Sequence, residues 1–179
     1  MLTNQLAATY AQAIYEIADS KNMLDEVEQQ LATVAETIKS HEDLSMLMYH
    51  PMVPAQVKKD TLSQIFAEGL TDYVRNFLML LVDKRRETAL PSITKEFVRL
   101  ANEKRNIAEA EVITAMPLTA EQESALKAKL SAVTGKNIIL KPQVDKEIVG
   151  GVIVRIGNKL IDGSVTGRIA ALRTALLKG

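Results

Sequence analysis

The spacing of apolar residues changes once along this chain, and that change constrains the fold more than any other feature of the sequence. From residue 3 to about residue 105, apolar side chains recur every three or four positions, which is the period of an amphipathic helix. From residue 108 they alternate with polar side chains, which is the period of a half-exposed strand. The sequence therefore predicts an all-α N-terminal bundle of about six helices over 1–105, followed by a small α+β domain over 106–179.

Helix-start and helix-stop residues divide the first region into segments. Pro54 suits the first position of one helix, and Thr71 is placed to cap another that runs to about residue 85. The last helix of the region spans about 89–105, and the short connections favour antiparallel neighbours. The predicted apolar stripes include Leu24, Val27, Leu31, Val34 and Ile38 in the second helix, and Val57, Thr61, Ile65 and Phe66 in the helix after Pro54.

Strand and helix signals alternate in the second region. Thr119 and Gln122 have the spacing of a capping box, so we expect a helix to begin there and to end at Gly135. Ser164 is placed to cap a final helix. Strands are predicted at 108–114, 138–140, 152–156 and 159–161, the last two as a hairpin. The predicted apolar stripes are Leu126, Leu130 and Val133 in the first helix, and Val165, Ile169, Leu172 and Leu176 in the last.

Composition removes much catalytic chemistry from consideration. The chain has 179 residues, no cysteine and only two histidines, His41 and His50. Without cysteine there is no thiolate nucleophile, and the two histidines do not have a metal-binding spacing. We therefore expect no catalytic residue, metal or cofactor. The longest apolar run, 77–82, is far shorter than the ~20 residues of a spanning helix, and the first residues do not resemble a signal or transit peptide.

Two short motifs leave other functions open as alternatives. Gly150 and Gly151 could belong to a nucleotide-binding domain, although they lack the Gly-x-Gly-x-x-Gly spacing and open a strand instead of a helix. Lys84, Arg85 and Arg86 could belong to a nucleic-acid-binding adaptor. No longer basic stripe or aromatic platform supports that second alternative, so nucleic acid is not an expected partner.

Two helices of the first region carry more apolar residues than one buried face requires. On the first helix, Tyr10, Ala13 and Ile17 continue an apolar surface beside the stripe of Ala7, Ala11, Ile14 and Ala18. On the fifth, the apolar residues of 73–82 nearly encircle the axis. Such a helix is either the buried centre of its bundle or offers a second face to a partner. The partner interpretation predicts an amphipathic helix bound between helices one and five.

Several segments together resemble the delta subunit of F-type ATP synthases, the relative of the mitochondrial oligomycin-sensitivity-conferring protein. Those segments are 8–14 (ATYAQAI), 76–81 (NFLMLL) with Arg86 and 90–93 (LPSI), 112–115 (VITA), and above all 145–157 (DKEIVGGVIVRIG) followed by 159–165 (KLIDGSV) and Arg168. The resemblance extends over essentially the whole chain. Thr9 departs from it, because the family often has a basic or proline residue before the Tyr-Ala pair.

The resemblance implies a non-catalytic stator subunit that links the catalytic head to the peripheral stalk and is needed for ATP synthesis driven by the proton-motive force. It implies that 1–105 bind the N-terminal helix of an alpha subunit and that 106–179 contact the b subunits of the stalk. The chain would then be associated with a membrane only through the complex, as a peripheral protein. The missing targeting signal points to the cytoplasmic face of a bacterial plasma membrane, although a mature organellar form would look similar.

The resemblance and the additional apolar residues of helices one and five together indicate which residues contact the partners. For the alpha-subunit helix we expect Tyr10, Ala13 and Ile17 on one wall of a groove and Asn76, Phe77 and Leu80 on the other. For the stalk, Ile169, Leu172 and Leu176 are candidates, although they could equally be core residues packed against the hairpin. Gly150, Gly151, Gly157, Asp162, Gly163 and Ser164 form a motif to which we assign a structural role.

Overall fold

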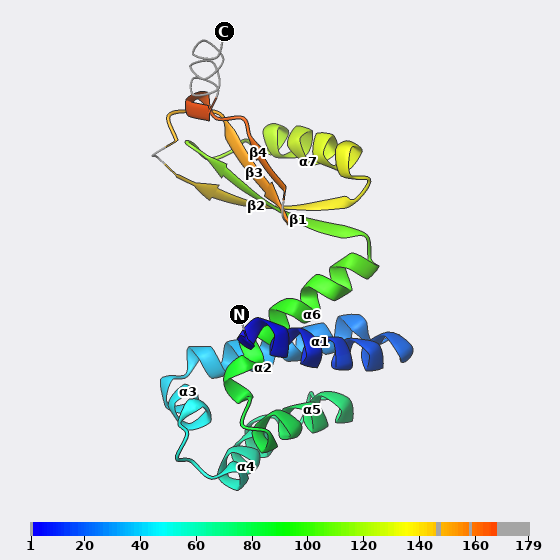
Figure 1. Ribbon diagram of the computed structural model, residues 1–179, viewed down its shortest axis with the longest axis vertical. Helices are drawn as coiled ribbons and strands as arrows, with labels where there is room; N and C mark the ends of the chain where they lie inside the picture. The colour runs from blue at the N-terminus through cyan, green and yellow to red at the C-terminus, as the bar shows by residue number, and fades with distance from the viewer. Residues whose placement is uncertain (1, 146–147, 158, 168–179) are drawn as a thin grey trace. The chain divides into compact units, whose positions relative to one another are not determined.

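The computed structural model describes residues 2–145, 148–157 and 159–167. The chain divides into two compact units, Met1–Ala101 and Asn102–Gly179. The first unit is helical, and the described part of the second contains a four-stranded sheet with a helix over it (Figure 1). The predicted fold class, a helical bundle followed by a small α+β region, is therefore confirmed.

The first unit follows the predicted helical segments closely. Thr71 caps the fifth helix as expected, because its side chain accepts a hydrogen bond from the backbone N–H of Val74. A short 3-10 helix that was not predicted, η1, precedes the last helix. The helices are α1 (Leu2–Ser20), α2 (Leu24–Ser40), α3 (Glu42–Tyr49), α4 (Ala55–Ile65), α5 (Asp72–Asp83), η1 (Glu87–Ala89) and α6 (Leu90–Lys104).

A single apolar core holds these helices together. The predicted stripe of α2 is buried in it at Val27, Leu31, Val34 and Ile38. Phe97 of α6 is fully buried, and its ring meets that of Tyr15 of α1 edge-on, with centroids 6.3 Å apart. Such edge-to-face contacts add to the free energy gained by burying the two rings. The helical period thus places most of the core correctly.

The predicted stripe of α4 is only partly right. Phe66, just after the helix, is buried as expected, but Val57 and Ile65 are exposed, and the helix turns Lys58 and Leu62 inward instead. Lys58 can occupy a buried position because its ammonium group forms an ion pair with the buried carboxylate of Glu87. A buried charge is tolerated when an opposite charge lies beside it. That partner lies 29 residues further along the chain, so the local pattern could not show it.

The second unit is a mixed sheet with the strand order β2-β1-β3-β4. Its elements are β1 (Ile107–Thr114), α7 (Ala120–Thr134), β2 (Asn137–Val144), β3 (Val152–Ile156) and β4 (Lys159–Asp162). The strands β1 and β2 are parallel and joined through α7, whereas β3 pairs antiparallel with both β1 and β4. The central strand β1 therefore pairs on both sides.

One face of this sheet packs under α7. Ala110, Val112, Ile138 and Val154 are buried together with Leu130 of the helix. The capping box of Thr119 and Gln122 begins α7, and Gly135 ends it in the left-handed conformation, both as predicted. Val133, which was expected in the stripe of this helix, is exposed instead. Leu130 and the half-buried Leu126 are the residues of α7 that pack against the sheet.

Asn106 shapes the chain just before β1. Its backbone is left-handed (φ 56°), its side-chain amide donates to the carbonyl of Gly135 (3.0 Å), and its own carbonyl accepts the N–H of Asn137 (2.9 Å). Asparagine tolerates this conformation better than other residues with a Cβ.

Replacing Asn106 tests both roles. Asn106→Ala should lower the free energy of unfolding of the second unit by about 1–2 kcal/mol, because it loses the side-chain hydrogen bond and strains the backbone. Asn106→Gly should cost less, since glycine keeps the conformation. Urea unfolding of both variants checks this expectation, and equal losses would contradict the backbone contribution.

The motif at 150–164 forms a tight crossing between the start of β3 and the end of β4. Gly151 has φ +89°, and a Cβ there would lie 2.4 Å from the carbonyl oxygen of Gly163 and 2.8 Å from Cα of Ser164. The backbone N–H of Gly163 donates to the carbonyl of Val152 (2.9 Å). Ser164 Oγ accepts the N–H of Gly167 (2.9 Å), which is the geometry of a helix N-cap. In this structure the glycines at the crossing allow two backbone segments to meet.

The carboxylate of Asp162 accepts hydrogen bonds from Ser164 in this turn. Hydrogen bonds from the Ser164 hydroxyl and from the Ser164 backbone N–H, the latter 2.8 Å long, lower the pKa of the Asp162 carboxyl. Its ordinary value is 3.8. These hydrogen bonds stabilise the ionised carboxylate in the folded state. Their contribution to stability is therefore complete above the unfolded-state pKa, and it is lost as the pH falls through the lower pKa of the folded state.

This linkage predicts a pH effect. Acidification from about pH 5 to about pH 3 should lower the melting temperature of the second unit more in the unchanged protein than in Asp162→Asn, which cannot titrate. The effect is small because Asp162 is exposed to solvent. Thermal unfolding at the two pH values measures the difference, and parallel losses in both proteins would contradict the prediction.

A candidate helix-binding surface on α1 and α5

The residues predicted on α1 lie beside the buried stripe of that helix. Ala7, Ala11, Ile14 and Ala18 are buried in the core. Tyr10 is half-buried, Ala13 is exposed and Ile17 is 42% exposed. The positions 10, 13 and 17 follow helical spacing, so these three side chains share one face that is open to a partner.

The residues predicted on α5 divide between the core and the surface. Leu80 is 43% exposed and Asn76 is exposed, but Phe77 is only 7% exposed and belongs to the core. Tyr73, which was not predicted as a contact, is 40% exposed and precedes Asn76 by three positions. The i, i+3, i+7 spacing of 73, 76 and 80 could have identified it. We call Tyr10, Ala13, Ile17, Tyr73, Asn76 and Leu80 the α1–α5 surface.

An aromatic contact joins the two halves of this surface. The rings of Tyr10 and Phe77 meet edge-on, with centroids 6.4 Å apart and an interplanar angle of 66°. The two helices are neighbours in the bundle (Figure 1). The buried ring of Phe77 therefore packs against Tyr10, while Ile17 and Leu80 remain exposed to solvent. Helix α5 contributes both to the core, through Val74, Leu78, Leu81 and Val82, and to this exposed surface.

Two carboxylates on these helices, Glu16 and Asp83, have partners within the bundle. On α1, the side-chain amide of Gln12 donates to the carboxylate of Glu16 (2.8 Å). At the end of α5, Asp83 forms an ion pair with Lys59 of α4 (2.5 Å). The six residues of the α1–α5 surface carry no charge, and their polar side-chain groups are the Asn76 amide and the hydroxyls of Tyr10 and Tyr73.

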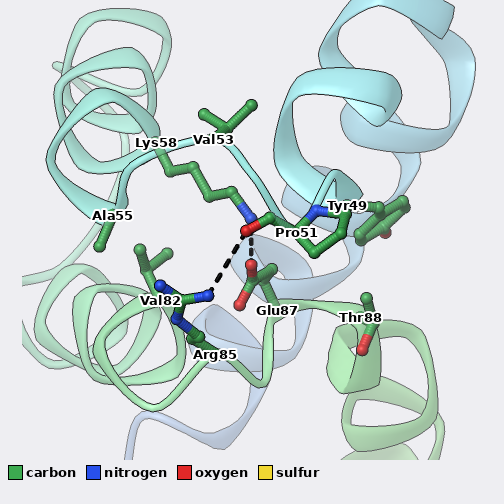
Figure 2. Close-up of a pocket in the computed structure, with 9 residues that line it drawn as sticks. All are labelled: Tyr49, Pro51, Val53, Ala55, Lys58, Val82, Arg85, Glu87 and Thr88. Atoms are coloured by element: carbon green, nitrogen blue, oxygen red, sulfur yellow. Dashed lines mark hydrogen bonds and ion pairs between the residues drawn. The ribbon is translucent and has the colours of Figure 1, made fainter.

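A pocket of about 110 Å³ lies elsewhere in the bundle, where α3, α4 and α5 come together with η1 (Figure 2). It contains the Lys58–Glu87 ion pair, and Arg85 donates a long hydrogen bond to the carbonyl of Pro51 (3.4 Å). Burial raises the pKa of the Tyr49 hydroxyl. The lining residues are Tyr49, Pro51, Val53, Ala55, Lys58, Val82, Arg85, Glu87 and Thr88.

The other candidate residues do not assemble a site in the described part of the chain. Gly150 and Gly151 precede a strand, and Lys84 and Arg85 follow the end of α5. Among the described residues, no three His, Asp or Glu side chains gather as metal ligands, and no helix is long and apolar enough to span a membrane. Ile169, Leu172 and Leu176 lie outside the described residues.

Comparisons with known proteins place the chain among the subunits of ATP synthases. It is 42% identical to ATP synthase subunit delta of Heliobacterium modesticaldum over 99% of this chain and 96% of that protein. It is 43% identical to the subunit of the same name from Desulforamulus reducens, over 99% and 98%. A solved structure, the Toxoplasma gondii mitochondrial ATP synthase hexamer, contains a chain that matches with a TM-score of 0.75 and 25% identity, covering 96% of this chain and 97% of that one.

The family model described as ATP synthase delta (OSCP) subunit matches residues 6–176. The chain belongs to this family, so the resemblance deduced from the sequence is confirmed. It is a stator component of an F-type ATP synthase, and its association with a membrane is through that complex.

Proposed function

We propose that the α1–α5 surface binds the N-terminal helix of an alpha subunit in the catalytic head. The observation that carries this proposal is the exposure of Ile17 and Leu80 on neighbouring helices, joined by the Tyr10–Phe77 contact. An amphipathic helix could bury both side chains at once, with its apolar residues at i, i+3, i+4 and i+7. Asn76 can form a hydrogen bond with the partner and so help to fix its position along the surface.

The expected energetics suit a permanent mechanical joint. Burial of apolar area contributes about 25 cal/mol per Å², so a docked helix gains several kcal/mol. Part of this gain is offset by side-chain ordering and by the lost translational and rotational freedom of the partner. The α1–α5 surface belongs to helices that are already packed through Ile14 and Phe77, so little further ordering of this chain is needed.

The second unit serves as the other attachment point in this proposal, and it contacts the b subunits of the peripheral stalk. Ile169, Leu172 and Leu176 stay proposed contacts. In the described part of the sheet, Ile139 and Leu160 are exposed apolar residues that add to the available surface. Two attachment sites on one molecule raise the effective concentration of each partner, so the joint holds better than either contact alone.

In this function the chain has no covalent chemistry of its own. It resists rotation of the catalytic head so that torque from the rotor drives ATP synthesis. It lies at the cytoplasmic face of a plasma membrane, held there by its partners. Because a connector needs rigid attachment and no reacting groups, the apolar α1–α5 surface suits this function better than it suits catalysis.

Titration of the full chain with a synthetic peptide of the alpha-subunit N-terminal helix tests the central proposal. We expect saturable binding below about 50 µM with a gain of helical circular dichroism as the peptide folds. A scrambled peptide of the same composition is the control. No binding at that concentration to the demonstrably folded chain would overturn the assignment.

A further inference from the structure

The Lys58–Glu87 ion pair is a buried structural feature that the proposed function does not use. Lys58 comes from α4 and is 3% exposed, and Glu87 begins η1 and is 8% exposed. Removing two charges from water costs several kcal/mol per ion, and their attraction repays this only when the remaining hydrogen-bonding groups are also satisfied. The pair therefore raises the question of what satisfies its other polar atoms.

Those other atoms are unpaired within the part of the chain that the structure describes. Glu87 Oε2 is buried and has no hydrogen-bond partner there, while Oε1 accepts from Lys58. The Lys58 ammonium carries three donors, of which the described residues engage one. A buried carboxylate oxygen without a donor is destabilising, so native proteins rarely leave one unpaired.

The pocket of Figure 2 lies at these same groups, because both Lys58 and Glu87 line it. Its volume of about 110 Å³ exceeds the roughly 10–15 Å³ that one water molecule needs. Tyr49 and Thr88 also line it. A carboxylate turns readily about its last side-chain bond, so rotation of the Glu87 carboxylate exchanges the places of its two oxygens.

We propose that this pocket is a water-binding site in which ordered water accepts a hydrogen bond from Lys58 and donates one to Glu87. The unpaired groups select this occupant. A cation would face both Lys58 and the Arg85 guanidinium, and an anion without a proton to donate would leave Glu87 Oε2 unpaired. A neutral molecule that both donates and accepts matches the unpaired groups on both sides, and water is the smallest such molecule.

A crystal structure of the full chain, at a resolution that shows ordered water, tests the proposal directly. We expect a water peak within about 3 Å of both the Glu87 carboxylate and Lys58 Nζ. Two results would overturn the proposal. One is a pocket without water in which the Arg85 guanidinium donates directly to Glu87. The other is a dry pocket that takes up xenon under pressure, as apolar cavities do.

A double variant provides the matched control in solution. Lys58→Met combined with Glu87→Leu roughly keeps the volume but removes the two groups that hold the water in this proposal, and such replacements are often tolerated. Water-to-amide cross-relaxation at Thr88 should be present in the unchanged protein and lost in the double variant. Equal signals in both proteins would overturn the proposal. Binding of the alpha-subunit peptide should be the same in both, so this test is separate from that of the proposed function.

Discussion

Gly151→Ala should unfold the second unit at a much lower urea concentration than in the unchanged protein. The substitution forces a Cβ to within 2.4 Å of the Gly163 carbonyl oxygen, at a residue whose φ is +89°. Backbone strain and the displaced β4 end should together cost about 2–5 kcal/mol. Urea unfolding of the full chain, followed by amide signals from β1 and β3, measures the loss.

Gly135→Ala is the matched control for this substitution. Gly135 also has a left-handed backbone (φ +68°), but a Cβ there meets nothing within 4 Å. Its cost should be limited to the conformational penalty of about 1–2 kcal/mol. If both variants lose the same stability, then the close approach of Gly151 to Gly163 contributes nothing.

Leu80→Asp should weaken binding of the alpha-subunit helix by about 1–3 kcal/mol, which is roughly 5-fold to 150-fold in Kd. The side chain is 43% exposed, so an aspartate can remain hydrated in the free chain. In the complex the same carboxylate would be buried against apolar side chains, which is unfavourable without a partner charge. Calorimetric titration with the peptide provides the measurement, and helical circular dichroism reports whether the bundle remains folded.

Val57→Asp is the control for this second prediction. Val57 is also 43% exposed but lies on α4, outside the α1–α5 surface. It should leave peptide binding within about 0.5 kcal/mol of the unchanged value. Equal losses for both variants would place the binding site elsewhere, and loss of helicity in Leu80→Asp would show that Leu80 acts as a core residue.

The sequence pattern predicts elements well where a local signal decides them. The helical period of α2 and the capping box of Thr119 and Gln122 both reappear in the structure because each depends on residues within one or two turns. Strand β2 is longer than predicted, since it continues through Lys141 to Val144 by pairing with β1. That extension depends on a neighbouring strand, which a local pattern does not contain.

The orientation of α4 shows why the remainder could not be predicted. Val57 and Ile65 are more apolar than Lys58, so hydrophobicity alone predicts the wrong buried face for α4. The ion pair with Glu87, which is distant in the sequence, allows the face with Lys58 to be buried instead. On α5 the limit is different, because an all-round apolar helix gives no direction at all. Only packing separates the buried Phe77 from the exposed Leu80.

The position of β1 in the middle of the sheet has a consequence for the order of folding. This strand is made before both of its partners, and pairing with β3 joins Ala110 to Ile156, which lie far apart along the chain. Closing such a loop is slow, whereas the contacts of a helical bundle are mostly local and form quickly. During synthesis the first unit should therefore fold before β2 and β3 have been made and can pair with β1.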